Sequence, residues 1–180
     1  GANLSGASLF GADLWGVNLS SADLSGANLS GANLCDVNLS SADLSGADLH
    51  GVRSGGIMGT PMALPDGWQL IEGHLVGPSA DLNGAWLYGW NLTSVNMSGA
   101  NLGDVNLYDV NFTSVNMSGV NLRGGALGDV NLYDVNLSYA NLSNTFLSYS
   151  DLNSVNLSYA DLSNTGLYNV NLYDVNLSGS

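Results

Sequence analysis

The chain has 180 residues, the length of a single domain, and 45% of them are hydrophobic, which is enough to build a buried core. Fifteen acidic residues against two basic ones give a formal net charge of -13 at pH 7. Such a charge opposes contact with nucleic acid or an anionic membrane, and it favours cations or basic protein surfaces as partners. We therefore expect one domain over residues 1–180 that binds neither nucleic acid nor membrane directly.

Cysteine content and hydropathy exclude several further classes. Cys35 is the only cysteine, so the chain can form neither an intrachain disulfide nor a zinc site built from cysteines. No apolar run is long enough to span a bilayer, and no basic segment followed by an apolar one opens the chain. The sequence favours no particular compartment.

A period of five residues dominates the chain from its first residues. Leucine, occasionally replaced by another large apolar residue, recurs at every fifth position from Leu4 to Leu49 and again from Leu82 to Leu177. Ala or Val usually stands two positions earlier, with Asn or Asp between them. This spacing fits neither the 3.6-residue period of a helix nor the continuous alternation of a long strand. It predicts a strand fragment with two inward side chains, followed by a tight turn at Gly, Ser or Asp.

Four such units with a turn at each corner would close one coil of roughly 20 residues, with neighbouring coils stacked about 4.8 Å apart. The sequence supports this coil length, because the pattern Val-Asn-Met/Leu-Ser begins at Val95, Val115, Val135, Val155 and Val175. We therefore predict an all-β solenoid of about eight coils. Its leucines would form an inner column, and the Asn and Ser side chains would form outward, hydrogen-bonded ladders.

The repeat fails after Val52, and the interval from Leu49 to Leu82 is not a multiple of five, which predicts an insertion at about 55–74. Turn signals at Pro61 and at 65–67 support it. Residues 68–71 and 74–76 then flank Glu72-Gly73, an arrangement typical of a short hairpin. Counting back from Leu82 places Leu75 in an inward position.

The hairpin brings Trp68, Glu72 and His74 together in the sequence, and two interpretations follow. One is an acid/base or ligand site. The other is a hairpin that packs Trp68 and Ile71 against the side of the solenoid, and it is favoured because no nucleophile or third group accompanies the pair. We predict no catalytic residue, no cofactor and no metal ligand, since outward Asp and Asn side chains on a flat face do not converge as calcium requires.

The repeated unit, Ala-(Asp/Asn)-Leu followed by two further residues, resembles that of the pentapeptide-repeat family. The resemblance extends from Ala2 to Val52 and from Ala80 to Gly179. It implies a right-handed quadrilateral parallel β-helix, interrupted here by one hairpin-like loop.

Several units depart from the repeat on one side of the second stretch. Trp86 and Phe146 replace the polar middle residue, and the 20-residue count places them on one face, where Tyr88, Tyr108 and Tyr168 follow central residues. These aromatic residues are either tolerated surface side chains or a contact surface, because clustered exposed aromatics favour interfaces.

The resemblance also implies an alternative function, because some pentapeptide-repeat proteins mimic DNA and inhibit type II topoisomerases. Duplex DNA carries one charge per about 1.7 Å, so a solenoid about 38 Å long would need about 22 negative charges to match it. The net charge of -13 makes the chain a partial mimic. The acidic patch predicted for this role consists of Asp104, Asp109, Asp129 and Asp134.

The sequence thus predicts a non-enzymatic acidic solenoid that acts as a structural scaffold or a protein-interaction rod. Self-association end to end is expected as well, because solenoid ends without caps expose unpaired strand edges. The alternative is a DNA-mimic inhibitor or protector of a type II topoisomerase. The protein partner is not identified by the sequence.

Overall fold

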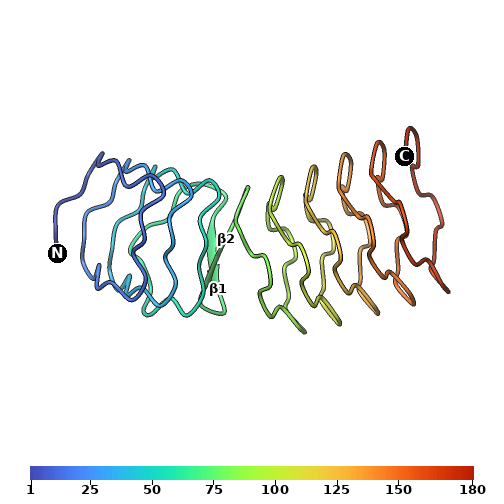
Figure 1. The fold of residues 1–180 in the computed structure, drawn as a ribbon, viewed down its shortest axis with the longest axis horizontal. Helices are drawn as coiled ribbons and strands as arrows, with labels where there is room; N and C mark the ends of the chain where they lie inside the picture. Colours follow the sequence, from blue (N-terminus) through green and yellow to red (C-terminus); the bar gives the residue numbers. More distant parts are fainter. The chain divides into compact units, whose positions relative to one another are not determined.

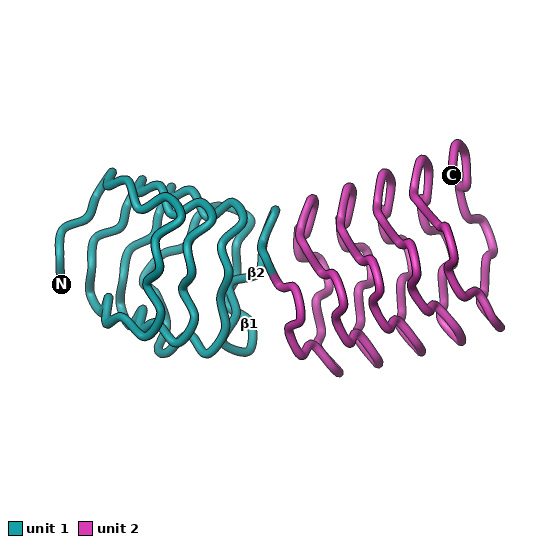
Figure 2. Tube along the Cα trace, viewed as in Figure 1, with its two compact units in different colours: residues 1–81 teal, residues 82–180 magenta.

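The computed structural model describes all of residues 1–180 (Figure 1). Contacts divide the chain into two compact units, residues 1–81 (unit 1) and residues 82–180 (unit 2), which Figure 2 colours separately. Each unit is a β-solenoid whose coils lie side by side, joined by isolated parallel β-bridges. The only continuous strands are β1 (Gln69–Ile71) and β2 (His74–Val76). The chain contains no long apolar helix of the kind that spans a bilayer.

A unit that follows the consensus satisfies all of its backbone N–H groups, as residues 28–32 show. Asn28 donates to the preceding coil at 2.9 Å, while Leu29 and Gly31 donate to the following coil at 2.9 and 2.8 Å. The N–H of Ala32 donates to the carbonyl of Leu29 at 2.9 Å and closes the turn. The N–H of Ser30 remains, and it donates to the side-chain oxygen of Asn28 at 3.0 Å. The outward Asn or Asp is therefore a structural residue, because it accepts the one N–H that no backbone carbonyl reaches.

The turn limits which residue types can stand two positions after each leucine. This residue has a positive φ, for example 67° at Gly31, 56° at Asp36 and 57° at Ser41. Glycine adopts such a conformation without a steric cost, and Asn and Asp tolerate it better than other residues do. The corner positions rich in Gly, Ser, Asp and Asn follow from this requirement.

Middle residues pair with their equivalents 20 positions away, which confirms the predicted coil length. In unit 2 the resulting ladders define four faces in chain order. They are face 1, with Asn101, Asn121, Asn141 and Asp161; face 2, with Trp86, Asn106, Ala126, Phe146 and Gly166; face 3, with Asn91, Asn111, Asn131, Asp151 and Asn171; and face 4, with Asn96, Asn116, Asn136, Asn156 and Asn176.

The predicted inner column and outer ladders are both confirmed. Central residues such as Leu29, Leu107 and Leu137 are completely buried, and the preceding Ala or Val residues lie beside them. On face 4, each carboxamide from Asn116 to Asn176 donates to the one 20 residues earlier, at 3.1 to 3.3 Å. These side chains therefore bond both to the turn and to the next coil.

Regular pairing continues past the point where the sequence predicted an insertion. Met58 pairs with Asn38 and Ala63 with Asp43, both at the normal interval of 20, whereas Asp81 pairs with Arg53 at an interval of 28. The eight additional residues therefore lie between 63 and 81 rather than throughout 55–74. The repeat is obscured in the sequence because Ser54 and Gly59 occupy two central positions where leucine is expected.

The predicted hairpin is present within this segment. Strands β1 and β2 pair antiparallel with Leu70 opposite Leu75, and the two turn residues Glu72 and Gly73 both have positive φ. Such a turn matches the twist of paired strands. Leu75 is fully buried in the core of unit 1, where its N–H donates to the Ser54 hydroxyl at 2.9 Å. The hairpin thus supplies apolar surface where the coil has a serine at a central position.

Leu137→Ala should lower the free energy of unfolding by about 2–5 kcal/mol, because it leaves a cavity in the inner column. Leu177→Ala is the matched control, since Leu177 occupies the same face and is 46% exposed. Urea denaturation followed by circular dichroism measures both. An equal decrease in the free energy of unfolding in the two variants would contradict the burial of Leu137.

Candidate interaction surfaces

All five predicted aromatic residues lie on face 2 of unit 2. The bridges join Trp86 and Phe146 into one ladder, while Tyr88, Tyr108 and Tyr168 each follow a central residue of that face. Their side chains are between 42% and 73% exposed. The spacing argument therefore placed them correctly, and their role in binding stays a prediction.

Face 2 also lacks most of the side-chain acceptors found on the other faces. Its middle residues Trp86, Ala126, Phe146 and Gly166 carry no oxygen in their side chains, and only Asn106 accepts the N–H two residues ahead, from Tyr108 at 3.1 Å. On the other four units of face 2, the N–H two residues after the middle residue has no protein acceptor. These N–H groups belong to Tyr88, Gly128, Ser148 and Tyr168. Face 2 thus combines apolar rings with backbone donors that a ligand or water can satisfy.

Glycines of the following coil accommodate the rings on this face. A Cβ atom added to Gly128 would clash with the ring of Tyr108, and one added to Gly166 would lie 3.1 Å from Cδ1 of Phe146. Both rings therefore lean along the solenoid toward its C-terminal end. This packing fixes ring orientation while leaving one side of each ring in water.

The four predicted acidic residues occupy three consecutive corners around faces 2 and 3. Asp104 lies between faces 1 and 2, Asp109 and Asp129 lie one above the other between faces 2 and 3, and Asp134 lies between faces 3 and 4. All four have φ between 54° and 61°. Ser114 donates to Asp134 at 3.1 Å from the neighbouring coil.

Acidic and aromatic residues therefore share one side of unit 2, which we call the aromatic–acidic side: faces 2 and 3 with their bounding corners. It carries six of the seven Asp residues of the unit, all except Asp161. Faces 1 and 4 are mostly lined by Asn and Ser. The six residues are Asp104, Asp109, Asp129, Asp134, Asp151 and Asp174.

Five exposed tyrosines of unit 2 were missed in the sequence: Tyr133 and Tyr173 follow central residues of face 3, and the other three lie at corners. Tyr139, Tyr149 and Tyr159 occupy the corner position, with φ of 60°, 64° and 60°, where Gly, Asp or Asn is preferred. Tyr139 and Tyr159 stack with ring centroids 5.1 Å apart and an interplanar angle of 9°. Tyr149 contacts Tyr168 edge to face at 5.6 Å. A tyrosine at the turn position of the repeat is the signal that could have identified the three at the corners.

In the hairpin, His74 contacts the backbone of Glu72. His74 Nδ1 lies 3.0 Å from the backbone carbonyl oxygen of Glu72, not from its carboxylate. Trp68 and Leu70 pack against the unit 1 core, so the packing interpretation is confirmed for Trp68, with Leu70 in the place predicted for Ile71. Nowhere do three or more His, Cys, Asp or Glu side chains converge as metal ligands.

Local bonds and burial shift the pKa of three other groups. The hydroxyl and N–H of Ser25 lower the pKa of Asp23, and Ser163 does the same for Asp161. These bonds therefore support folding at neutral pH, and their contribution is lost as the pH falls through the lowered pKa. Burial raises the pKa of the partly exposed Cys35 thiol, and nearby Arg53 partly opposes that shift.

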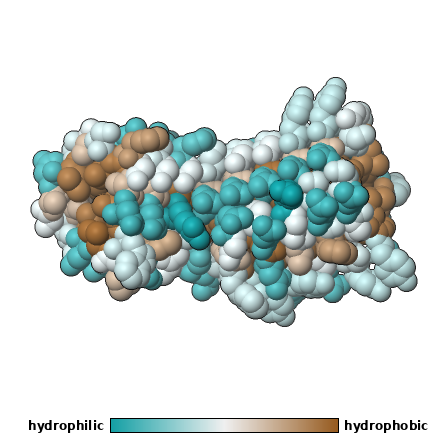
Figure 3. All heavy atoms as spheres, in the orientation of Figure 1, coloured by the Kyte–Doolittle hydropathy of each residue, from teal (hydrophilic) through white to brown (hydrophobic).

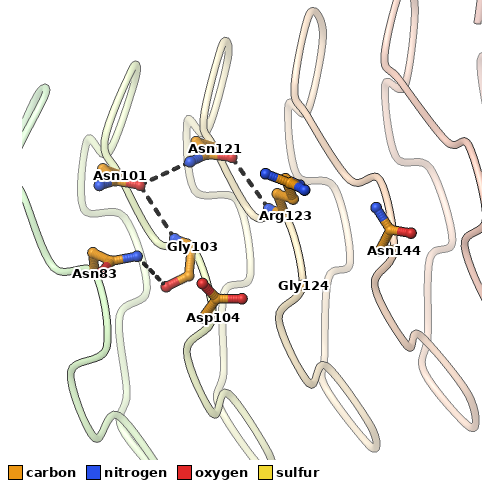
Figure 4. A pocket seen from close by; sticks show the side chains of 8 residues that line it. All are labelled: Asn83, Asn101, Gly103, Asp104, Asn121, Arg123, Gly124 and Asn144. Carbon is orange, nitrogen blue, oxygen red and sulfur yellow. Dashed lines mark hydrogen bonds between the residues drawn. The ribbon is translucent and has the colours of Figure 1, made fainter.

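Unit 2 also contains a polar hollow of about 590 Å³ on the face 1 side (Figure 4). An amide network lines it: Asn121 Nδ2 donates to Asn101 Oδ1 at 2.8 Å, and Asn83 Nδ2 donates to the Gly103 carbonyl at 2.7 Å. The complete lining is Asn83, Asn101, Gly103, Asp104, Asn121, Arg123, Gly124 and Asn144. The sequence analysis did not predict this hollow.

Five-residue units, four faces per coil and an inner leucine column define a quadrilateral β-solenoid. The sequence model for pentapeptide repeats matches in 8 copies, at residues 1–26, 18–53, 91–127, 131–167 and 147–180. The chain belongs to the pentapeptide-repeat family, as its repeat unit predicted.

Solved structures of the same kind are similar at low sequence identity. A pentapeptide repeat protein (Rfr23) from the cyanobacterium Cyanothece 51142 is 19% identical, over 86% of this chain and 90% of that one, with a TM-score of 0.49. HetL from Nostoc sp. strain PCC 7120, involved in heterocyst differentiation regulation, is 24% identical over 97% and 86%, with a TM-score of 0.35. Trypsin-treated QnrB1, a plasmid-mediated fluoroquinolone resistance protein, is 17% identical over 98% and 89%, with a TM-score of 0.34. A comparison with curated proteins found no significant match.

Ala126→Asn should stabilise unit 2 by about 0.5–1.5 kcal/mol, because it supplies an acceptor for the N–H of Gly128. Asn136→Ala is the converse control and should destabilise the unit, since Asn136 accepts the N–H of Ser138 at 3.2 Å. Thermal unfolding midpoints test both predictions: the midpoint should rise in Ala126→Asn and fall in Asn136→Ala. A midpoint unchanged in both would show that these side-chain bonds do not contribute to stability.

Proposed function

We propose that the protein is a non-enzymatic acidic scaffold that binds a protein partner through the aromatic–acidic side of unit 2. The observation that carries this proposal is the coincidence of exposed rings, backbone N–H donors without a protein acceptor and acidic corners on the same side. Aromatic residues are enriched at protein interfaces because they bury a large area with few rotatable bonds. The N–H groups would bond to carbonyl oxygens of the partner.

The charge of this side indicates the kind of partner surface. Six carboxylates and no Lys or Arg lie on it, since Arg123 belongs to face 1. A basic protein surface would gain long-range attraction to the carboxylates, and its arginines could stack on the exposed rings. Complementary charge raises the rate of association more than the final affinity.

The combined variant Trp86→Asn/Phe146→Asn tests this proposal, because it removes two rings and restores the repeat consensus without disturbing the inner column. Proteins captured from the native source would be purified and titrated against both forms by calorimetry. We expect binding about tenfold weaker in the variant, as for loss of central aromatic contacts. Ser118→Ala/Ser158→Ala on face 4 is the control, because the bonds of these residues use the backbone and survive the change. Equal losses in both variants would contradict a role specific to face 2.

Inhibition or protection of a type II topoisomerase is the second candidate function. The observation that favours it is the concentration of negative charge on one side of unit 2, which makes this side more like DNA than the net charge alone suggests. Replacing Asp104, Asp109, Asp129 and Asp134 by Asn preserves the positive-φ turns while removing four charges.

Purified DNA gyrase provides the assay. Micromolar wild-type protein should inhibit supercoiling, or restore it in the presence of a fluoroquinolone, and the four-Asn variant should lose most of the effect. Neither effect at any concentration up to about 100 μM, well above a micromolar dissociation constant, would exclude this candidate.

Self-association through an end of unit 2 is a further part of the proposal. Within the 180-residue chain, the coil of residues 161–180 leaves Leu167, Leu172 and Leu177 40%, 43% and 46% exposed, whereas their equivalents one coil earlier are buried. Figure 3 shows hydrophobic atoms gathered at this end. Pairing of two such ends would bury apolar surface and continue the backbone ladders.

Sedimentation velocity over a concentration series of the 180-residue chain tests self-association. We expect a concentration-dependent dimer in the wild type and a monomer after Leu172→Asp, because a charge on the exposed leucine opposes burial of that end. A wild-type monomer across the whole series would contradict it.

A further inference from the structure

Two glycines in neighbouring columns belong to the lining of the polar hollow of unit 2. One column, directly after the central residues of face 1, contains Asn83, Gly103, Arg123 and Ser143 at intervals of 20. The next column, at the corner, contains Gly84, Asp104, Gly124 and Asn144. Gly103 lies between Asn83 and Arg123 in the first column, and Gly124 lies between Asp104 and Asn144 in the second, so neither position carries a side chain that would crowd the Asn83 amide or the Asp104 carboxylate.

Neighbouring side chains lie close to both glycines, so neither position has room for a Cβ atom. A Cβ atom added to Gly103 would lie 2.9 Å from Nδ2 of Asn83 and 3.3 Å from Nδ2 of Asn121. One added to Gly124 would clash with Oδ1 of Asp104. Figure 4 shows Asp104, Arg123 and Asn144 arranged around the backbone of Gly124. Even a methyl group at either position would therefore intrude into the hollow or displace its lining.

The lining carries one positive and one negative group that are not paired with each other. Arg123 is the only basic residue of unit 2, and Asp104 is the only acidic residue of the lining. Both side chains are exposed, and neither takes part in a salt bridge or in a hydrogen bond through its charged group. The other polar groups of the lining are carboxamides and backbone groups, which can both donate and accept.

We propose that this hollow binds a small zwitterion, with its carboxylate on the Arg123 guanidinium and its ammonium group on Asp104. The planar guanidinium can hold a carboxylate through two parallel hydrogen bonds, and a carboxylate accepts readily from an ammonium group. Asn144 and the Asn101–Asn121 amides would bond the remaining polar atoms. A free amino acid has both charges in one molecule and is small enough to enter the 590 Å³ hollow, where water would occupy the remaining volume.

Ligands with a single charge fit this site less well. Unit 2 carries seven Asp residues and one Arg, so its field opposes a simple anion approaching Arg123. A simple cation would pair with Asp104 but would meet Arg123 in the same hollow. The inference does not rest on the proposed function, although Asp104 belongs to the predicted acidic patch, because its test uses small molecules and the hollow lies outside face 2.

Titration of the isotopically labelled 180-residue chain, followed by amide NMR, is the direct test. The probes are glycine, β-alanine and γ-aminobutyrate, which separate the two charges by increasing distances. At least one should shift the amide signals of Gly103, Arg123 and Gly124, with a dissociation constant on the order of millimolar, as expected for exposed charge pairs. Acetate and methylammonium should each bind about tenfold more weakly, because each uses only one of the two charges.

Variants of the lining separate the charges from the space. Arg123→Gln and Asp104→Asn should each weaken binding about fivefold or more while leaving the turns intact. Gly124→Asn should abolish it by occupying the hollow and displacing the Asp104 carboxylate, and the fold tolerates this residue because Asn144 and Asn164 occupy the same column with φ of 59° and 56°. Gly119→Asn is the matched control, because nothing lies within 4 Å of its added Cβ.

Three results would overturn the proposal. The first is the absence of localised shifts with all three amino acids at about 100 mM, far above a millimolar dissociation constant. The second is binding of glycerol as tight as that of the amino acids, which would make the hollow a site for neutral hydroxyl compounds. The third is unchanged affinity in Gly124→Asn, which would place the bound molecule elsewhere.

Discussion

Every coil of this protein depends on the backbone N–H group that no backbone carbonyl can reach. Four of the five N–H groups in a unit donate to the main chain, and the fifth, one residue after the central leucine, donates to an Asn or Asp side chain, as Ser30 does to Asn28. The same carboxamides then bond to one another between coils on face 4. The outward polar column therefore stabilises the fold, as the inner leucine column does. A unit without Asn or Asp at its middle position loses one hydrogen bond, worth about 0.5–1.5 kcal/mol.

Face 2 departs from this rule repeatedly, and the fold persists because repeat proteins add many similar stabilising terms along their length. Trp86, Ala126, Phe146 and Gly166 offer no acceptor, yet Leu87, Leu107, Leu127 and Leu147 beneath that face remain fully buried. The ring of Tyr108 over Gly128 and that of Phe146 over Gly166 recover some contact area between coils. The loss of hydrogen bonds and the gain of exposed rings coincide on one face, and this coincidence is the reason for proposing a binding surface there.

The sequence predicted the features that follow from period and spacing. The 20-residue coil and the common face of Trp86 and Phe146 came from counting residues, and the hairpin at Glu72-Gly73 came from the two short stretches that flank this turn. The course of residues 55–64 was not predicted, because Ser54 and Gly59 hide the repeat while the backbone keeps it. The hollow was missed because its lining residues, Gly103 and Gly124 among them, come together from adjoining columns, a relation visible only when the coils are stacked.

The corner tyrosines show that some side chains are not explained by the stability of the chain itself. Their positive φ costs on the order of 1–3 kcal/mol per residue, whereas Gly99, Gly119 and Gly179 occupy the same column as Tyr139 and Tyr159 without that cost. Stacking of the two rings returns about 0.5–1.5 kcal/mol. Stacking alone therefore does not offset the strain of two residues. Burial of the exposed rings against another molecule would supply about 1.5–3 kcal/mol for each ring, enough to reverse the balance. Tyr139 and Tyr159 lie at the corner between faces 4 and 1, outside the aromatic–acidic side, so the proposed partner surface does not account for them, whereas Tyr149, at the corner between faces 2 and 3, belongs to that side.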